Sequence, residues 1–406
     1  MTEQQRTDWP MVALLIAGGI VAAMQVGKVP PLIPILRQEL ALGLVASGWL
    51  ASSIQVVGAC AGLVCGSLAD RMGRRRAVLI ACAIGLLASS GGALAPDGTW
   101  LLAFRVAESV SFVFLVVSLP GLIVAASAMP DLRLSVGLWS IYMPTGVTIA
   151  MIAVPLLAPL VGWRPLWWGG GLVMAAYGIA LALAFRSRPP PPAAPENQRA
   201  GLADFLAVLR RPGCWLLGLS FGFYTFQWFA VATWLPTFAQ ADMGVTVTEA
   251  GLLAALVVAA NIVGCVGGSF VLHRGVPRWM ILAAVNGLLG LLSLGIFDAG
   301  LPGVLRIGMA IVFSAFGGML PAAVLAAAPM HAPHPRAIGA VNGLIVQGST
   351  TGAVIGPPVI ALAVSSGGNW GEASWVLTLS GAFGVCAALV LRLIERHLLR
   401  EADRRG

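Results

Sequence analysis

The amino-acid sequence predicts an all-α membrane protein of twelve transmembrane helices, arranged as two six-helix bundles related by pseudo-symmetry. Three observations lead to this prediction. The composition is 58% hydrophobic and only 10% charged, whereas soluble domains carry about 25% charged residues. Apolar stretches of about 20 residues, the length that crosses a bilayer core as a helix, recur along the chain. Unusual residues of the first half also return in the second half at a nearly constant spacing.

Each apolar stretch is expected to be helical, because lipid offers no hydrogen-bond partner to the backbone groups of an open sheet edge. The sequence also lacks the ten-residue alternation of a membrane β-barrel. The first span is too long for a signal peptide, and eleven spans follow it, so we expect the mature protein to keep it. The predicted spans are 11–36, 44–68, 77–95, 100–128, 134–160, 166–185, 214–238, 248–272, 279–297, 301–328, 337–364 and 373–394.

The cationic residues predict the orientation. Of the 24 Lys and Arg residues, nineteen fall on or near the side of the predicted membrane that holds the N-terminus, two fall on the other side and three lie well within spans. Cytoplasmic loops are the ones that carry such an excess. We therefore expect a multi-pass protein of a bacterial-type inner (cytoplasmic) membrane with both termini in the cytoplasm. The net charge of +8 then reports topology, and no nucleic-acid partner is expected.

The segment 186–213 divides the chain into two parts of nearly equal length. It contains the run Pro189–Pro192, which favours an extended polyproline conformation, and it is rich in Arg. We predict an N-terminal six-helix bundle over 1–185, a cytoplasmic Pro/Arg-rich linker over 186–213, and a C-terminal six-helix bundle with a cytoplasmic tail over 214–406.

An internal repeat relates the two halves at offsets of about 201 to 206 residues. Matched Gln, Arg and Leu-Pro are informative here, because matched Gly and Ala are expected by chance in so apolar a chain. Both halves run in the same direction with six spans each, which predicts a parallel duplication with a binding site between the halves near mid-membrane. The pairs are Gln25 with Gln227, Pro34 with Pro236, Gly66 with Gly268, Gly73 with Gly275, Arg76 with Arg278, Arg105 with Arg306, Leu119-Pro120 with Leu320-Pro321, Gly137 with Gly343, and Gly146 with Gly352.

The turn after the second predicted span reads G-S-L-A-D-R-M-G-R-R-R over residues 66–76. Its glycines permit a tight turn and a close approach of helices. Asp70 can pair with a neighbouring Arg or lie at a helix N-terminus, and the Arg cluster marks the cytoplasmic face. The plainest alternative is a positively charged loop with a turn glycine and no further role.

With this segment the sequence resembles the major facilitator superfamily, whose signature G-x-L-a-D-r-x-G-r-[kr] it matches. The resemblance covers essentially the whole chain, with twelve spans, a central linker and the six-plus-six repeat. It implies a secondary active transporter that works by alternating access, and no enzyme. It also implies a role in conformational switching for Gly66, Asp70, Arg71, Gly73 and Arg74. The second copy of the motif has Leu272 in place of the aspartate, so the role does not extend to it.

Shorter matches point to branches of this family. The segment Arg105–Ser109 resembles the arginine region of the family's fourth helix. The segment Tyr142–Thr148 keeps a proline but lacks the paired glycines that exporters often carry in the fifth helix. The phrases Gly162–Arg164 and Trp234–Phe238 resemble the cyanate and nitrate permease branch.

Four charged residues lie well inside predicted spans, away from their ends: Lys28, Arg105, Glu108 and Arg306. A charge at the centre of a spanning helix costs about 2.5–3.5 kcal/mol on insertion scales, so such residues are functional by default. Three cations against one acid favour a small anionic solute, since Arg presents a planar fork to oxyanions. Glu108, one turn from Arg105, is the candidate proton-coupling residue, and Gln25 lies one turn before Lys28.

Two alternatives stay open for these charges. Lys28 can extend its side chain to the outer headgroups, and Arg105 with Glu108 can form an ion pair of purely structural importance. The predicted substrate-binding set is completed by three further polar or aromatic residues, each of which is alternatively a helix-packing residue: Gln227, Tyr142 and Asn261.

Other chemistry is not expected. No Walker loop is present, so we do not expect ATP-driven pumping. The six Cys and four His residues lack the spacing of metal ligands, and we expect no catalytic residue, no metal and no cofactor.

The leading hypothesis is proton-coupled uptake of a small organic or inorganic anion by a monomer in the lipid bilayer. The alternative is proton-antiport efflux of drugs or other toxic compounds. A third hypothesis, from a different class, is a membrane receptor that binds without transporting.

Overall fold

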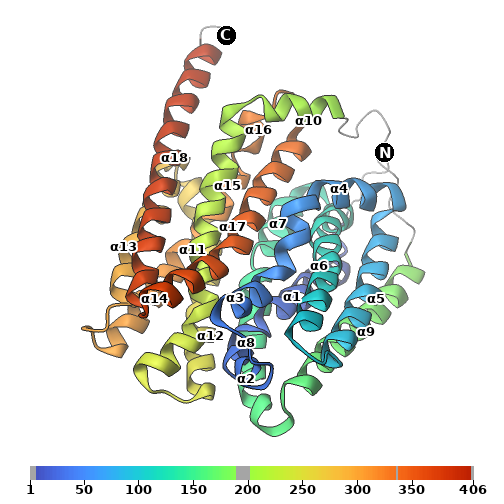
Figure 1. Cartoon of the computed structure of the whole chain (residues 1–406). Helices are drawn as coiled ribbons and strands as arrows, with labels where there is room; N and C mark the ends of the chain where they lie inside the picture. The colour runs from blue at the N-terminus through green and yellow to red at the C-terminus, as the bar shows by residue number, and fades with distance from the viewer. Residues whose placement is uncertain (1–5, 189–201, 335–336, 404–406) are drawn as a thin grey trace.

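The computed structural model describes residues 6–188, 202–334 and 337–403. Within these ranges the chain is helical without a strand, and twelve helical segments are long and apolar enough to cross a membrane. The predicted fold class is therefore confirmed (Figure 1). Each predicted span corresponds to one of the twelve segments, with ends that differ by a few residues.

The helices of the first half form one bundle and those of the second half form another (Figure 1). The first comprises α1 (Trp9–Gly27), η1 (Pro30–Leu32), α2 (Ile33–Glu39), α3 (Leu44–Ser52), η2 (Ser53–Gln55), α4 (Val56–Met72), α5 (Arg74–Ala93), α6 (Gly98–Ala126), η3 (Met129–Asp131), α7 (Leu132–Trp139), α8 (Tyr142–Val161) and α9 (Trp163–Arg186). The second comprises α11 (Pro212–Met243), α12 (Val247–His273), α13 (Arg278–Ile296), α14 (Gly303–Gly317), α15 (Met319–Leu325), α16 (Ala328–His331), α17 (Ile338–Gly367) and α18 (Gly371–Asp403).

A short helix, α10 (Leu202–Leu209), lies within the segment predicted as a linker and crosses the end of the second bundle (Figure 1). The polyproline run Pro189–Pro192 lies outside the described residues.

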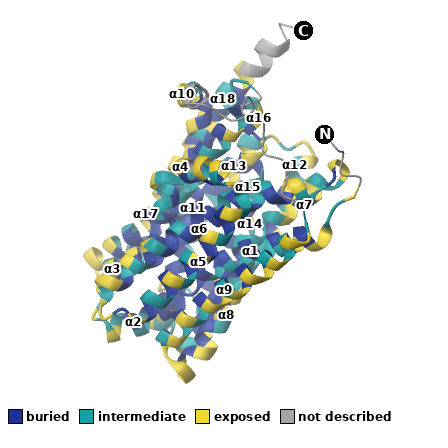
Figure 2. Cartoon of the chain, turned by 90° about the vertical axis from the view of Figure 1, so that its right-hand side faces the viewer, coloured by how far each residue is buried: buried dark blue, intermediate teal, exposed yellow. Residues whose placement is uncertain are grey.

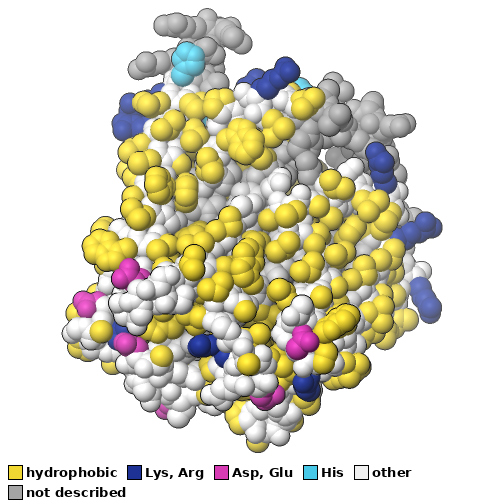
Figure 3. Space-filling view, viewed as in Figure 1, with side chains coloured by type: hydrophobic (Ala, Val, Ile, Leu, Met, Phe, Trp, Pro, Cys, Tyr) yellow, Lys and Arg dark blue, Asp and Glu magenta, His cyan; other side chains and the backbone are white. Residues whose placement is uncertain are grey.

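The start of α1 and the end of α18 lie at the same end of the molecule (Figure 1). We call this the terminal end and the opposite one the distal end. On the face in Figure 3, most Lys and Arg side chains lie toward the terminal end and the Asp and Glu side chains toward the distal end. A wide apolar surface separates them. Exposed residues cover the outside of the helices, while buried residues follow the middle of the molecule (Figure 2).

The repeat is visible in equivalent helix contacts. Gly146 in α8 packs so closely on α1 that a Cβ atom would overlap the carbonyl oxygen of Ile20. Gly352 in α17 packs in the same way on α11, against the carbonyl oxygen of Gly222. Small residues allow this approach in membranes, where close packing supports helix association. Ile20 and Gly222 are themselves 202 positions apart, so the two contacts are equivalent in the repeat.

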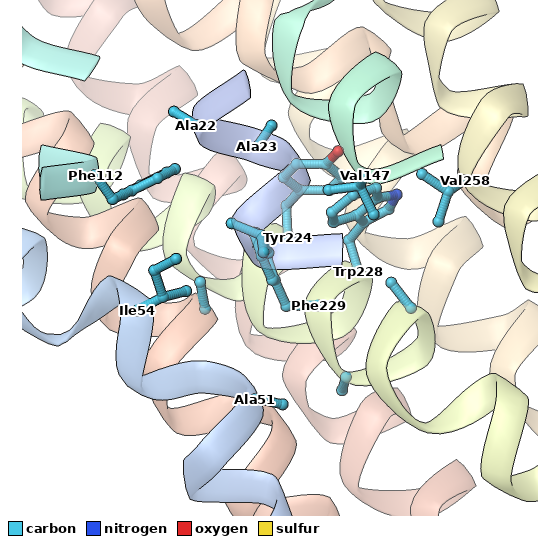
Figure 4. Packing of buried hydrophobic residues seen from close by; sticks show 14 of the residues in the cluster. Ala22, Ala23, Ala51, Ile54, Phe112, Val147, Tyr224, Trp228, Phe229 and Val258 are labelled. Carbon is cyan, nitrogen blue, oxygen red and sulfur yellow. The ribbon is translucent and has the colours of Figure 1, made fainter. Parts of the chain in front are cut away.

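The two bundles are closed against each other toward the distal end. A Cβ atom at Gly48 in α3 would lie 3.0 Å from the carbonyl oxygen of Pro357 in α17. The hydroxyl of Thr248 in α12 donates to the carbonyl oxygen of Pro155 in α8 at 3.3 Å. Apolar side chains of both bundles then face one another in the middle, as Figure 4 shows for Ala22, Ala23, Phe112, Tyr224, Trp228 and Phe229.

Toward the terminal end, α4 has open space around two of its glycines. The amide of Gln347 in α17 donates to the carbonyl oxygen of Ala59 at 2.9 Å. Beyond this point, Gly62 and Gly66 have no atom of the described chain within 4 Å of a Cβ position. The close helix approach predicted for Gly66 is therefore wrong in this conformation. Its repeat partner Gly268 makes such an approach instead, against Met319.

Replacing Gly146 by Ala is expected to destabilise the protein by about 1–3 kcal/mol, because the new methyl group forces α1 and α8 apart. The measurement is the thermal unfolding midpoint in detergent. Gly137→Ala is the matched control, since Gly137 lies in helix α7 with open space around its Cβ position. Equal midpoints for the two variants would contradict the packing role of Gly146.

An ion pair ties the start of α1 to the chain just after α9. Arg188 donates from Nε to Asp8 Oδ2 at 2.5 Å and from Nη2 to Asp8 Oδ1 at 3.1 Å. The hydrogen bond from Arg188 is the main reason why the pKa of Asp8 is lowered. A lowered folded-state pKa adds stability above the unfolded-state pKa and loses it as the pH falls through the folded-state value.

Acidification below about pH 4, the ordinary pKa of Asp, is therefore expected to weaken the protein partly through this pair. Thermal midpoints recorded as a function of pH test this. Asp8→Asn should remove part of the acid-induced loss, whereas Asp298→Asn in an exposed loop should not. If the pH profile of Asp8→Asn overlays that of the wild type, the ion pair of Asp8 and Arg188 does not contribute to the acid-induced loss of stability.

Candidate functional site

The site begins with two interrupted helices. Pro30 and Pro31 have no N–H group, so α1 cannot continue and ends at Gly27. The second span is interrupted where α3 passes through the 3₁₀ turn η2 into α4. Carbonyl groups at the end of a helix lack intrahelical partners and carry the negative end of the helix dipole. The interruptions therefore place acceptors for cations inside the bundle.

Arg105 of α6 binds these carbonyl groups and has no solvent exposure. Its Nη1 donates to the carbonyl oxygen of Gln25 at 3.0 Å, at the end of α1. Its Nε donates to the carbonyl oxygen of Leu50 at 3.2 Å and its Nη2 to that of Ala51 at 3.5 Å, both at the end of α3. Nη1 also donates to Glu108 Oε2 at 2.5 Å. One guanidinium thus joins three spans.

Lys28 binds the same carboxylate. Its Nζ lies 2.7 Å from Glu108 Oε1, 2.8 Å from Gln25 Oε1 and 3.3 Å from Ser89 Oγ. Ser89 of α5 in turn donates to Glu108 Oε1 at 2.6 Å. Lys28 is only 5% exposed, so its side chain does not extend to the outer headgroups. We call the set of Gln25, Lys28, Ser89, Arg105 and Glu108 the charge network.

Helix α9 closes the charge network. The amide of Gln25 donates to the carbonyl oxygen of Gly170 at 3.0 Å. The indole ring of Trp167 has its centroid 4.4 Å from Lys28 Nζ and 6.0 Å from Arg105 Cζ. The structure therefore brings together Gln25, Lys28, Arg105 and Glu108 as the sequence predicted. It places them among α1, α5, α6 and α9 of the first bundle, whereas the prediction placed them between the halves.

A cavity of about 10 Å³ adjoins the network. That volume is near the minimum that holds one water molecule. A solute therefore does not fit beside the carboxylate in this conformation. The lining residues are Ala22, Gln25, Gly85, Ser89, Glu108, Ser111, Phe112 and Met174.

Arg306 does not join the charge network, which corrects the prediction of one cluster of three cations. It lies near the distal end of the second bundle, where Nη1 donates to Asp242 Oδ2 at 2.6 Å and Nε to the carbonyl oxygen of Ile296 at 3.0 Å. Its guanidinium stacks on Phe238 at 4.5 Å. Asp242 was missed because the seventh span was predicted to end at residue 238, whereas α11 continues to Met243. The charge of Arg306 is thus balanced locally.

The other predicted binding residues lie apart from the charge network. Gln227 is buried in the second bundle, where its amide donates to Asn286 Oδ1 at 3.4 Å. Asn261 donates to the hydroxyl of Tyr224 at 3.2 Å and to the carbonyl oxygen of Ser314 at 2.8 Å. Tyr142 stacks on Trp139 with ring centroids 4.3 Å apart, at the terminal end of α8.

The turn motif makes its contacts within the first bundle. Gly73 has a φ of +85°, which favours glycine and produces the predicted tight turn between α4 and α5. Arg74 donates from Nε to Asp70 Oδ1 at 2.7 Å. Its guanidinium lies directly over Gly121 of α6, where a Cβ atom would overlap it. Asp70 and Arg74 thus connect α4, α5 and α6.

The comparisons with known proteins agree with this architecture. The family model of the Major Facilitator Superfamily matches residues 15–348. The chain belongs to the Major Facilitator Superfamily. A search of curated protein sequences finds no match. As members of this superfamily are transporters, the chain is a membrane transporter and no enzyme.

Solved structures show the same fold at low sequence identity. One is a bacterial homolog of the human lysosomal transporter Spinster, inward-facing and unoccupied, with a TM-score of 0.77 and 16% identity over 97% of this chain and 98% of that one. The inward-facing, occupied form of such a homolog gives a TM-score of 0.73 and 17% identity over 98% and 97% of the two chains. These matches identify the superfamily fold, and the cyanate and nitrate permease branch stays a prediction.

Arg105→Lys is expected to lower the thermal midpoint more than Arg306→Lys, its repeat partner. Lysine keeps the charge but loses the planar fork. The carbonyl oxygen of Ala51 then loses its side-chain donor, and that of Leu50 keeps only the hydroxyl of Ser53. The loss of a buried acceptor's partner costs about 1–3 kcal/mol. Arg306 bonds to one carbonyl group and one half-exposed carboxylate. Midpoints in detergent measure the difference, and equal losses would show that Arg105 does not depend on its fork.

Proposed function

We propose that this superfamily member moves a small anionic solute together with protons, and that Glu108 is the residue that carries the proton. The observation that carries the proposal is that one buried carboxylate is shared by two cations, Lys28 and Arg105. Glu108 is 2% exposed. Ionisable groups at such depth are the usual proton relays of transporters.

The chemistry follows from the contacts of the carboxylate. A proton that binds Glu108 cancels the negative charge that holds Lys28 and Arg105. Both cations then lose their main partner in a medium of low dielectric constant, where an unpaired charge is expensive. The carbonyl bonds of Arg105 to α1 and α3 are the contacts that remain. Proton binding therefore changes the balance of forces at the junction of three spans.

Charge also supports an anionic solute. With Glu108 ionised, the charge network carries one positive charge in excess, whereas Arg306 is matched by Asp242. A negatively charged solute that reaches Lys28 would replace the partner that protonation removes. Gln25, already bonded to Lys28, would add an amide donor.

Alternating access would then proceed by rocking of the two bundles. In the present conformation the bundles are in contact toward the distal end, and Gly62 and Gly66 of α4 face open space toward the terminal end. We assign the terminal end to the cytoplasm of a bacterial-type inner membrane, since nineteen of 24 cations were predicted there. We propose that the switching residues act when the cytoplasmic ends close: Gly66, Asp70, Arg71, Gly73 and Arg74. We propose that the solute is transported inward, as uptake, and that the protein works as a monomer.

The second candidate is antiport efflux of amphipathic compounds. The observation in its favour is the apolar and aromatic surface at which the bundles meet, including Phe112, Tyr224, Trp228 and Phe229 (Figure 4). Ligand sites for drug-sized compounds are mostly apolar with a few polar groups. Asn261, bonded to Tyr224, would be one such group.

Proteoliposomes that contain a pH-sensitive dye distinguish the candidates. Addition of a panel of small carboxylates and inorganic anions outside should acidify the lumen if solute and proton move together. Glu108→Gln is expected to slow this proton movement at least tenfold. Antiport would produce the opposite change in pH, and it would respond to amphipathic cations rather than to anions.

Glu249→Gln is the matched control. Glu249 closes the capping box at the start of α12, and glutamine serves in that motif as well. This variant should behave as the wild type. Coupled proton movement that persists in Glu108→Gln would rule out Glu108 as the proton carrier.

A further inference from the structure

The charge network has an aromatic neighbour that neither the sequence nor the superfamily match assigns. Trp167 of α9 has no solvent exposure. Its ring lies 4.4 Å from Lys28 Nζ and 6.0 Å from Arg105 Cζ. A cation within about 6 Å of a ring centroid is attracted by the negative face of the ring, most strongly where water is excluded. The two cations that share one carboxylate thus have a second source of stabilisation.

The fold holds this ring by shape. Gly92 of α5 leaves room for it, since a Cβ atom there would lie 2.6 Å from Trp167 Nε1. Trp163 packs edge-on against the ring at a centroid distance of 5.6 Å. The buried Nε1 of Trp167 has no hydrogen-bond partner among the described residues. The indole is therefore placed for its face, and its polar atom contributes no bond.

We propose that Trp167 is a positioning residue of the proton site, whose ring stabilises Lys28 and Arg105 as cations when Glu108 becomes neutral. This inference rests on the proposed function, because it requires Glu108 to bind a proton. With Glu108 ionised the network carries one excess positive charge, and with Glu108 protonated it carries two. The ring therefore favours the protonated state more than the ionised one.

Ionisable groups lie at the face of the Trp167 ring and toward both ends of α9. The groups directly at its face are Lys28 from α1 and Arg105 from α6, with Glu108 bound to both. Further toward the terminal end, α9 and α5 carry Tyr177 and Cys82 beside Gly18 and Gly178. At the distal end, Trp163 donates to Glu39 and stacks on Arg164.

Infrared difference spectroscopy of the full chain in lipid nanodiscs tests the inference without any solute. Protonation of Glu108 adds a carboxylic acid C=O band that Glu108→Gln lacks, and the band is followed as a function of pH. Trp167→Leu should move the midpoint of this titration to lower pH by about one unit. Trp167→Phe keeps an aromatic face, so it should move the midpoint in the same direction but by much less.

Trp168→Leu is the matched control. Trp168 is the next residue and is 38% exposed, so its loss should leave the midpoint unchanged. A titration of Trp167→Leu that overlays the wild type would overturn the role of Trp167. If Trp167→Leu does not elute as a folded protein in size-exclusion chromatography, Trp167→Phe decides, with a smaller shift in the same direction expected and no shift counting against the role.

The proposed function fails in a different way. If no band disappears in Glu108→Gln at any pH, Glu108 does not take up a proton, whatever the Trp167 variants do.

Discussion

The rest of the structure depends on one buried carboxylate that two cations share. Removing three charges from water is unfavourable, and in lipid they persist only where hydrogen bonds satisfy every polar atom. Glu108 meets this requirement with Lys28, Arg105 and Ser89. Arg105 meets it with carbonyl groups that lie where α1 and α3 end. The helix ends thus supply acceptors to the buried cation, and the cation supplies donors to the helix ends.

The duplicated halves share a framework but differ in chemistry. The glycine contacts of α1 with α8 and of α11 with α17 are equivalent, so the backbone arrangement repeats. At the position related to Gln25, Gln227 bonds to the neutral Asn286. Arg306 has no acid one turn on, because Met309 stands where Glu108 would be, and it turns instead to Asp242. Backbone packing is therefore kept in both halves, while an ionic site is built in one.

Much of this was accessible from sequence, for identifiable reasons. The spans were predictable because the thickness of the bilayer fixes their length. The region of Lys28, Arg105 and Glu108 was predictable because charged residues inside a membrane are rare. The partners that other helices supply to these charges were not predictable, since Ser89 and Trp167 look like ordinary residues of apolar spans. Asp242 was missed because a helix can extend beyond the apolar stretch from which it is predicted. The placement of Arg306 failed because equal positions in a repeat do not guarantee equal side-chain directions.

The location of the charge network also bears on how the two bundles move. Arg105 binds the carbonyl groups of Leu50 and Ala51, and two residues before Leu50 in the same short helix lies Gly48. Gly48 packs against Pro357, whose carbonyl oxygen also accepts from Trp234 at 2.8 Å. The distal closure of the bundles is therefore less than one helical turn from the carbonyl groups that Arg105 holds. Because α3 is a separate short helix, a change in the bonds of Arg105 acts on the closure without first bending a continuous span.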